Sequence, residues 1–538
     1  MPYSEADMSD AQAESAHSPS SPATAAQPQN NTEVFAVHGA DPEVLAYAMA
    51  KYSRSSLSMR ESLRQISSER AEQFLNTFYF QYGHRSIADL AHLAFAVERL
   101  SLLAAISLVD EQRWDGQERS TRYQDFRKSG WYLPEFGSDQ AAQTCYRASV
   151  EASFEAYHQL SEGMLGVYQE RVACPAEMAP DAYVRTLRAR AFDVARALLP
   201  LATNTSLGQI VNARTLETQI SRLLSSPIAE IRDLGEQLRK AASEPAWDVY
   251  AQDRERLLRR LKDADAELAH EYEDFLLRSV RPAPTLMKYA AANDYQQHTR
   301  RELQQAALEL MGEVAVNQAP LVDLVEPGES LVSELAATLL YAQSHYPYRQ
   351  LRDAVVGMGE QRAAEIVEMG MRHRGRHDEL LREFSAGQAL RFDILMDIGG
   401  FRDMHRHRRC TQLIQNFTAQ HGFETPEELD GTPLAPVFVG AMRAAHFAYE
   451  QLAASSAPQQ TAATAAYVLP LATRCRALFK MDFAEALYIS ELRSAPQGHR
   501  TYRRVAWEMY QAVQRAHPEL ARYFRVTDID EPVNLLNR

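Results

Sequence analysis

The 538-residue chain contains few cysteines, few glycines and no long uncharged apolar run. Its four cysteines are scattered and form no CxxC pair: Cys145, Cys174, Cys410 and Cys475. This spacing excludes a disulfide framework or a zinc ribbon and fits a reducing compartment. No stretch reaches the ~18 uncharged apolar residues that a membrane helix needs, and the N-terminus lacks the pattern of a signal peptide. We therefore expect a cytoplasmic protein with no membrane partner.

Positive charge is also scarce, because 57 Lys and Arg face 71 Asp and Glu, for a formal net charge of −14. This balance argues against a general nucleic-acid binder, so an anion site must be a local basic cluster. Hydrophobic residues make up 46% and charged residues 24%, as in soluble globular proteins. A chain of this length is too long for one core and predicts two domains or more.

Composition along the chain predicts a short tail followed by a mostly helical protein. Residues 1–32 are rich in Ser, Ala, Pro and Gln, which predicts a disordered tail, with a partner-binding peptide as the alternative. With only 22 glycines, the long Ala, Leu, Glu and Arg segments favour helix. Residues 254–277 carry leucines and aromatics at helical spacing and predict one amphipathic helix. Short β-prone runs such as Val34–Val37 allow a small sheet.

A weak internal repeat divides the chain. Residues 198–203 read Leu-Leu-Pro-Leu-Ala-Thr, and residues 468–473 read Val-Leu-Pro-Leu-Ala-Thr. Pro200 and Pro470 lie 270 positions apart, far more than one solenoid repeat. With the linker candidate Arg281–Pro284, this predicts a duplicated domain, residues 33–285 and 286–538, that can pack as a pseudo-dimer.

Motifs in the first half match one enzyme family in order. Residues 117–123 read Gln-Glu-Arg-Ser-Thr-Arg-Tyr, residues 196–200 read Arg-Ala-Leu-Leu-Pro, and residues 211–216 read Val-Asn-Ala-Arg-Thr-Leu. They resemble the Asn-Glu-x-Ser-x-Arg-Tyr, Arg-x-x-Leu-Pro and Val-Asn-Ala-Arg-Ser-Leu motifs of the flavin-dependent thymidylate synthases. Residues 82–89 are similar to the family's Gly-His-Glu-Thr-Pro-Phe-Glu segment, with Ser86 in place of Thr and Asp89 in place of Glu.

The two halves resemble the family in complementary residues. Where the family has Arg-His-Arg, the first half has Asp110–Gln112, whereas the second half has Arg406–Arg408. The second half has Ala466 in place of the arginine of Arg-x-x-Leu-Pro. Its Glu491–Arg493 resembles the family's Asn-Leu-Arg, at a position where the first half has Leu223. Family active sites lie between subunits of a homotetramer, so the resemblance implies one composite site between the halves, one dead site, and a dimer of chains as a pseudo-tetramer.

The resemblance implies a helix-rich α/β fold, with helices on a small twisted sheet in each domain, and the methylation of dUMP to dTMP. FAD would be the cofactor, with methylenetetrahydrofolate and NADPH as co-substrates. The implied dUMP ligands are Glu118, Ser120, Arg122, Arg196 and Arg406, and arginine forks suit a phosphate dianion. The implied FAD ligands are Ser86, Asp89, Gln117, Asn212, Arg214, Arg406, His407 and Arg408. Arg493 and Ser120 are the implied catalytic residues, and Arg493 would stabilise charge on the pyrimidine oxygen.

Several of these side chains have plainer interpretations. Ser120 is either a nucleophile or, since no base adjoins it in sequence, only a nucleotide ligand. Glu118 is a general base, a salt-bridge partner or a ligand of the nucleotide sugar. Arg196 can simply pair with Asp193 or a distant acid. Trp114, like Tyr123, is typical of a core as well as of a stacking platform.

Three basic runs remain. Residues 405–409 are a solvated face unless they contact flavin or phosphate, as the resemblance implies. Residues 372–377 place His373 and His377 at i, i+4 spacing, but neighbouring arginines would repel a cation, so we expect no metal site. Residues 499–504 predict an exposed helical face.

Two other functions stay open. A non-catalytic relative would bind flavin or nucleotide, or act as an interaction scaffold. Asp403 stands where the family has Gln, and an acid near the phosphate or pyrimidine is unfavourable for the enzyme hypothesis. The third hypothesis is an all-helical regulatory protein whose motif matches are accidental.

Overall fold

The computed structural model describes residues 41–51, 85–127, 129–312, 314–325, 330–375, 378, 381–384, 386–454 and 464–536, with the side chains of residues 50, 51, 85, 86 and 519 excepted. The expected tail and the expected strand Val34–Val37 lie outside these residues. Asp41–Arg538 cluster as one unit, and the domain boundary near residue 285 remains a prediction. Among the described helices, none has the length and apolarity that crossing a membrane requires.

The first half contains a three-stranded antiparallel sheet in the order β1-β3-β2. Its strands are β1 (His92–Ser101), β2 (Asp115–Glu118) and β3 (Asn204–Asn212). In β3, Leu207 and Val211 are buried, whereas Ile210 is 54% exposed, the alternation of a strand with one face on the core. The buried face packs on three helices: α5 (Leu102–Leu108), α8 (Ala213–Leu224) and α9 (Ala229–Ser243). The other face of β2 and β3 is therefore available to line a site.

The second half contains a four-stranded antiparallel sheet in the order β4-β5-β7-β6. Its strands are β4 (Val322–Leu324), β5 (Leu390–Asp397), β6 (Thr411–Ile414) and β7 (Arg474–Met481). Leu478 of β7 packs with α13 (Leu331–Tyr341), α14 (Tyr348–Gly357) and α15 (Glu360–Met371). Its neighbours Ala477 and Phe479 belong to another core, which includes α20 (Arg500–Ala516). This sheet is thus covered on both faces.

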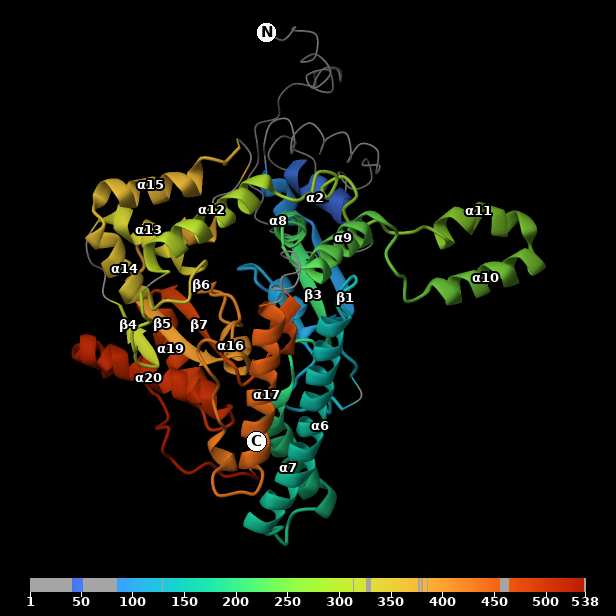
Figure 1. Ribbon diagram of the computed structural model, residues 1–538. Coiled ribbons are helices and arrows are strands. Elements are labelled where there is room, and N and C mark those ends of the chain that lie inside the picture. The colour runs from blue at the N-terminus through green and yellow to red at the C-terminus, as the bar shows by residue number, and fades with distance from the viewer. Residues whose placement is uncertain are drawn as a thin grey trace, which may run out of the picture. The chain divides into compact units, whose positions relative to one another are not determined.

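The remaining described helices join and flank these sheets (Figure 1). They are α2 (Pro42–Lys51), η4 (Arg85–Leu90), α6 (Gln140–Arg171), α7 (Pro180–Ala195), η5 (Arg196–Leu198), α10 (Ala251–Ala264), α11 (Ala266–Leu276), α12 (Asp294–Met311), η6 (Arg382–Phe384), α16 (Ile398–Met404), η7 (Glu427–Leu429), α17 (Ala435–Ala453), η8 (Ala466–Val468), α19 (Phe483–Ser494) and α21 (Pro518–Ala521). The expected fold class, helix-rich with a small sheet in each half, is confirmed.

The repeated Leu-Pro-Leu-Ala-Thr segments meet each other in the middle of the unit. Pro200 and Pro470 form an isolated antiparallel bridge. Leu201 N–H donates to the Leu469 carbonyl at 2.9 Å, and the equivalent Leu471 N–H donates to the Leu199 carbonyl at 3.0 Å. Reciprocal hydrogen bonds of this kind are the signature of a two-fold relation, so the duplicated halves pack as a pseudo-dimer.

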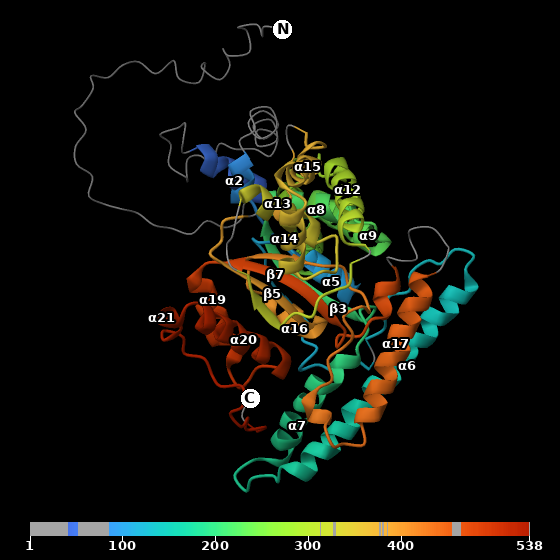
Figure 2. The same ribbon diagram turned by 60° about the vertical axis from the view of Figure 1, so that its left-hand side comes forward.

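Both halves contribute to the largest hydrophobic core. It joins Tyr157 and Leu198 of the first half to Phe392, Phe438 and Met509 of the second. Helices α6 and α17, which occupy equivalent places in the two halves, lie side by side in Figures 1 and 2. Burying such a side chain contributes about 1.5–3 kcal/mol, so the two halves hold each other in place.

Two expectations from the sequence are wrong. Residues 254–277 form two helices rather than one, because Asp265 has extended backbone and its carboxylate caps α11 by accepting from Leu268 N–H at 3.0 Å. Residues 499–504 are not an exposed face, because the start of α20 packs on α16 and buries Tyr502 and Arg503. In both places the apolar spacing alone does not reveal what the helix packs against.

Candidate functional site

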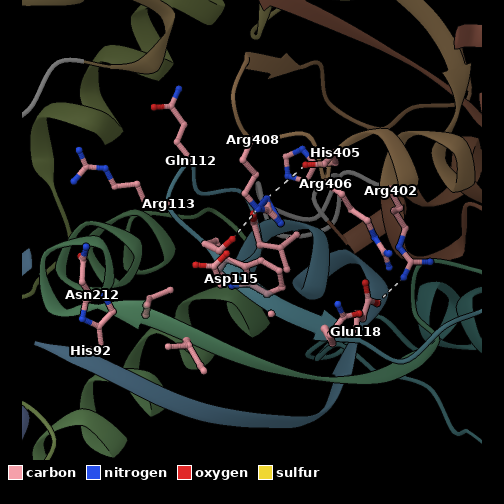
Figure 3. A pocket seen from close by; sticks show the side chains of 16 residues that line it. His92, Gln112, Arg113, Asp115, Glu118, Asn212, Arg402, His405, Arg406 and Arg408 are labelled. Carbon is pink, nitrogen blue, oxygen red and sulfur yellow. Dashed lines mark hydrogen bonds and ion pairs between the residues drawn. The ribbon is translucent and has the colours of Figure 1, made fainter. Parts of the chain in front are cut away.

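A pocket of about 530 Å³ opens between the two halves (Figure 3). The first half contributes His92, Val109, Gln112–Glu118 and Ile210–Asn212, and the second half contributes Arg402, His405, Arg406 and Arg408. Its volume is within the range of small-molecule sites, roughly 300–1,000 Å³. Four arginines and two carboxylates line it, so its wall is cationic in a protein of net negative charge.

The first-half wall is the exposed end of its sheet. Asp115, Gly116 and Gln117 of β2 are exposed, since β2 is an edge strand that pairs with β3. A side chain at Gly116 would come within 2.3 Å of the Gly208 carbonyl oxygen, so this close approach of the strands requires glycine. The Trp114 indole N–H donates to Gln209 Oε1 at 2.7 Å, which fixes the ring beneath the pocket.

The second-half wall is the end of α16. Its N-cap Asp397 accepts from Gly400 N–H and, at 2.9 Å, from the Thr501 hydroxyl, and burial raises the pKa of Asp397 to about 6. Arg402 lies in the last turn of α16, and Arg406 follows at i+4 spacing. The helix end therefore presents two guanidinium groups toward the same cavity.

Contacts across the pocket join the halves. Arg402 Nη2 donates to Glu118 Oε1 at 2.5 Å, and both side chains are nearly buried. Arg402 Nε is buried and has no hydrogen-bond partner among the described residues. Arg406 is exposed, and in the part of the chain that the structure describes its side chain makes no hydrogen bond or ion pair. These two arginines thus keep donors available to a ligand.

Arg408 has a different environment. Its guanidinium lies 4.5 Å from the Trp114 ring centroid and donates to the Trp114 and Val109 carbonyls, both at 3.1 Å. Trp114 is 8% exposed and therefore both a core residue and a platform for a cation. These contacts of Arg408 help to hold the second half against the first.

Behind the pocket, the buried arginines of the first half are held by carboxylates. Arg122 makes two 2.9 Å hydrogen bonds to Asp193 and a third, at 3.0 Å, to the Tyr502 hydroxyl. Arg196 donates to Asp403 Oδ2 at 3.1 Å and lies 3.5 Å from Asp193 Oδ1. The plainer interpretation of Arg196, an ion pair with Asp193 or a distant acid, therefore describes its contacts.

Asp403 is the point on which the cations converge. Burial raises the pKa of this carboxyl, but four guanidinium groups outweigh that effect and lower its pKa below the ordinary value. They are Arg196 and Arg122 from the first half and Arg406 and Arg493 from the second. A single carboxylate thus occupies the place where positive charge from both halves meets.

His407 and Arg493 belong to the same cluster. Arg493 Nε donates to His407 Nε2 at 2.7 Å, and its guanidinium lies 5.5 Å from the Tyr502 ring centroid. Burial, together with Arg493 and Arg406, lowers the pKa of His407 to about 3. The imidazole is therefore neutral at pH 7 and acts here as a hydrogen-bond acceptor.

The structure brings some of the predicted site residues to the pocket and places others nearby. The pocket is lined by Gln117, Glu118, Asn212, Arg406 and Arg408. The adjoining buried cluster contains Arg122, Arg196, His407 and Arg493. Asp89 is 3.5 Å from both Arg113 and Arg214. Ser120 Oγ accepts from Arg122 N–H at 3.3 Å in a turn. Ser86 lies in η4, and its side chain is outside the described residues.

Sequence reasoning missed Arg402 and Arg113 as pocket residues, and it considered His405 only as part of the basic run 405–409. The signal for Arg402 was its i, i+4 spacing from Arg406 at the end of a short helix. His405 is buried, hydrogen-bonds Gln412 Oε1 at 2.7 Å and stacks on Phe401. Nothing in its sequence context distinguishes it from a core histidine.

The histidine pair suggested for a metal does not form a described site. His373 Nε2 lies 2.9 Å from Glu302 Oε1, and His377 is outside the described residues. Over the ranges that the structure covers, no group of three His, Cys, Asp or Glu side chains is arranged to hold a metal ion.

The comparison with family models agrees with the duplication. A family model described as thymidylate synthase complementing protein matches residues 36–246 and 321–519. A UPF0159 protein of Chlamydia muridarum is 28% identical over 523 residues, covering 91% of each chain. A flavin-dependent thymidylate synthase of Clostridium tetani is 23% identical over 39% of this chain and 81% of its own. A crystal structure of the flavin-dependent thymidylate synthase ThyX from Helicobacter pylori, complexed with FAD and dUMP, matches 38% of this chain and 89% of that chain at 14% identity and a TM-score of 0.26.

Proposed function

Because the chain belongs to the thymidylate synthase complementing protein family, we propose that it is a flavin-dependent thymidylate synthase with one composite site per chain. It would convert dUMP to dTMP with methylenetetrahydrofolate and NADPH as co-substrates. The observation that carries the proposal is the cationic pocket lined by both halves, with Arg402 bonded to Glu118 across it. Neither half alone presents this set of side chains.

The residues of the pocket fit a flavin nucleotide. Arg406 and the unpartnered Arg402 Nε offer donors to phosphate or to the polar edge of a ring. Arg113 lies at the same wall, and its charge would reinforce the attraction for an anion. A bound flavin would supply hydride transfer and carriage of the one-carbon unit. The chain itself would hold, orient and shield the reactants.

The proposed position of dUMP rests on the cluster behind Arg406. For the dUMP phosphate to reach Arg122 and Arg196, it must replace the hydrogen bonds that Asp193 and Asp403 now make. Arg406 is the member of the set that faces the pocket with its donors unused. We assign the first contact with the phosphate to Arg406. Arg493 and Ser120 would orient the pyrimidine and nucleotide once it is bound.

A direct assay tests this proposal. Purified protein loaded with FAD is mixed with dUMP, methylenetetrahydrofolate and NADPH, and dTMP is measured by chromatography. We expect dTMP in amounts exceeding the protein concentration and rescue of a thymidine-requiring strain. Protein that binds FAD and oxidises NADPH but makes no dTMP would contradict thymidylate synthesis while leaving the composite flavin pocket intact.

A second function is favoured by one specific observation. Asp193 and Asp403 neutralise Arg122 and Arg196, so these two arginines carry no excess positive charge for a phosphate dianion. A flavin-binding protein without thymidylate synthase activity would be consistent with this balance. Equilibrium dialysis separates the two functions, because the enzyme binds dUMP in the presence of FAD and the inactive relative does not.

A further inference from the structure

Helices α10 and α11 carry an exposed apolar surface. They belong to a segment that lies outside the two ranges matched by the family model. The helical pair lies between the family segments, which end at residue 246 and resume at residue 321. Phe275 is 75% exposed and Tyr272 46%, and Trp247, at the base of the pair, is 86% exposed. Large exposed aromatics grouped on one segment are typical of a surface that binds another molecule.

The pair is poorly supported by the rest of its own chain. Among its side chains only Leu258 and Ala269 are buried. The two helices, of 14 and 11 residues, are held together by a 2.8 Å ion pair between Lys262 and Glu273. Helices this short are marginal in water without tertiary packing. Additional packing from outside the chain would stabilise them.

The apolar side chains form a stripe on each helix. On α10 the stripe contains Leu257 and Leu261, and on α11 it contains Leu268, Tyr272 and Phe275. These positions recur at three- and four-residue intervals, which places them on one face of each helix. Figure 1 shows that α10 and α11 run side by side and antiparallel. Stripes on two such helices give one apolar face suited to receive a second helical pair.

The two helices have opposite charge. Helix α10 carries five cations against three acids: Arg254, Arg256, Arg259, Arg260 and Lys262 against Asp253, Glu255 and Asp263. Helix α11 carries four acids and no lysine or arginine: Glu267, Glu271, Glu273 and Asp274. A surface that binds an anionic membrane or a nucleic acid would be basic throughout. A basic helix beside an acidic one is instead complementary to a copy of itself turned by a two-fold axis.

We propose that α10 and α11 form a homodimer interface, in which the apolar faces of two copies meet as a four-helix bundle. Helix α10 of one copy then lies against α11 of the second, and the same contact repeats on the other side of the axis. No residue of the pair lines the described pocket. Dimerisation through this surface therefore leaves ligand binding unchanged.

The first test is the mass of the full chain in solution. Sedimentation velocity should show a dimer for the unmodified protein, and Tyr272→Glu with Phe275→Glu should weaken dimerisation at least 100-fold. The matched control is Phe447→Glu on α17, which changes an aromatic of 62% exposure and should leave the dimer intact. Circular dichroism and FAD absorbance establish that each variant is folded.

A charge swap gives the second test. Arg260→Glu and Glu271→Arg, which flank the two apolar stripes, should each weaken self-association, whereas a mixture of the two variants should recover a heterodimer. The proposal is overturned if the unmodified chain is a monomer, and this holds even if the monomer binds anionic vesicles through this surface. A dimer unaffected by the Tyr272 and Phe275 changes, or a mixture that stays monomeric, overturns it as well.

Discussion

Equivalent strands in the two halves have opposite environments. In the first half β2 exposes Asp115–Gln117 at the pocket, and Ile210 of β3 is 54% exposed. In the second half β6 is buried, and Lys480, the counterpart of Ile210, is completely buried against Thr338 and Glu334. Burial lowers the pKa of Lys480 to about 8. In the duplicated chain, the outer face of β2 and β3 is therefore exposed, whereas the corresponding face of β6 and β7 is covered by side chains.

The Arg406–Arg408 motif and its first-half counterpart, Asp110–Gln112, show the same division. In the second half the motif provides Arg406 to the pocket. In the first half Asp110 pairs with Arg382 of the second half, and Glu111 pairs with Arg222 at 2.8 Å. Despite burial, Arg382 lowers the pKa of Asp110 well below its usual range. One copy of the motif thus lines the pocket, and the other makes structural contacts.

The largest effect should come from breaking the buried ion pair between Arg122 and Asp193, which lies behind the pocket. Arg122→Ala leaves Asp193 buried without its main partner, and we expect a loss of about 3–5 kcal/mol in the free energy of unfolding. Urea denaturation measures it. Arg127→Ala is the matched control, since Arg127 pairs with Asp125 and Glu162 at the surface and should cost less than about 1 kcal/mol. Equal losses in the two variants would contradict the structural role of Arg122.

The comparison between the two motif copies predicts a difference in binding. Arg406→Ala removes a charged donor from the pocket and should weaken dUMP or FAD binding by about 10- to 100-fold. Asp110→Asn changes the equivalent position of the other copy and should lower stability without changing affinity. Fluorescence quenching of FAD gives both affinities. Weakened binding in Asp110→Asn with normal binding in Arg406→Ala would reverse the assignment of the open site.

The neutral histidine beside the buried pair predicts a pH dependence. Burial is the main cause that lowers the pKa of His499 from 6.5 to about 4 in the folded protein. The unfolded chain takes up this proton first, so the stability contributed by neutral His499 is present above pH 6.5 and lost as the pH falls toward 4. Compared with His499→Gln, the unmodified protein should lose about 2–3 kcal/mol of unfolding free energy over that window.

Thermal melts at several pH values measure this difference. His270→Gln, on the exposed surface of α11, is the control for loss of an imidazole. A constant difference between the unmodified protein and His499→Gln from pH 7 to pH 4 would show that His499 is not buried in its neutral form.

The smallest effect concerns the carboxylate at the centre of the cationic cluster. Asp403→Gln removes the charge that competes with a phosphate for Arg196, and dUMP affinity should rise by about three- to tenfold. The unmodified side chain lies 3.1 Å from Arg196 Nη2. Titration calorimetry at fixed FAD measures the change. Weaker dUMP binding in Asp403→Gln would mean that Asp403 recognises the ligand instead of competing with it.

Much of this arrangement could be predicted because the two motif copies differ in sequence. The second half has Arg406–Arg408, which the first half lacks, but it has Ala466 in place of the first half's Arg196. This complementary distribution predicted that both halves would contribute to one site. The pairing of Arg122 with Asp193 could not be predicted, because these residues are 71 positions apart and meet only through tertiary packing. The break at Asp265 was missed because apolar spacing continues on both sides of it.

The same limit applies to the pocket wall. Local spacing places Arg402 and Arg406 on the same side of the chain at the end of α16, but it does not show that Glu118 lies opposite. Likewise, Trp114 has the composition of a core residue, and only the folded chain brings Arg408 over its ring. Local signals identify the cations, and tertiary contacts decide which of them remain available to a ligand.

The central claim is that one pocket per chain is assembled from both halves. Isothermal titration of FAD into the full chain, with Glu118→Ala and Arg402→Ala variants titrated alongside, tests it most directly. We predict one FAD per 538-residue chain and weakened binding in both variants, although the two residues come from different halves. Two FAD molecules per chain, or full affinity in either variant, would contradict the account.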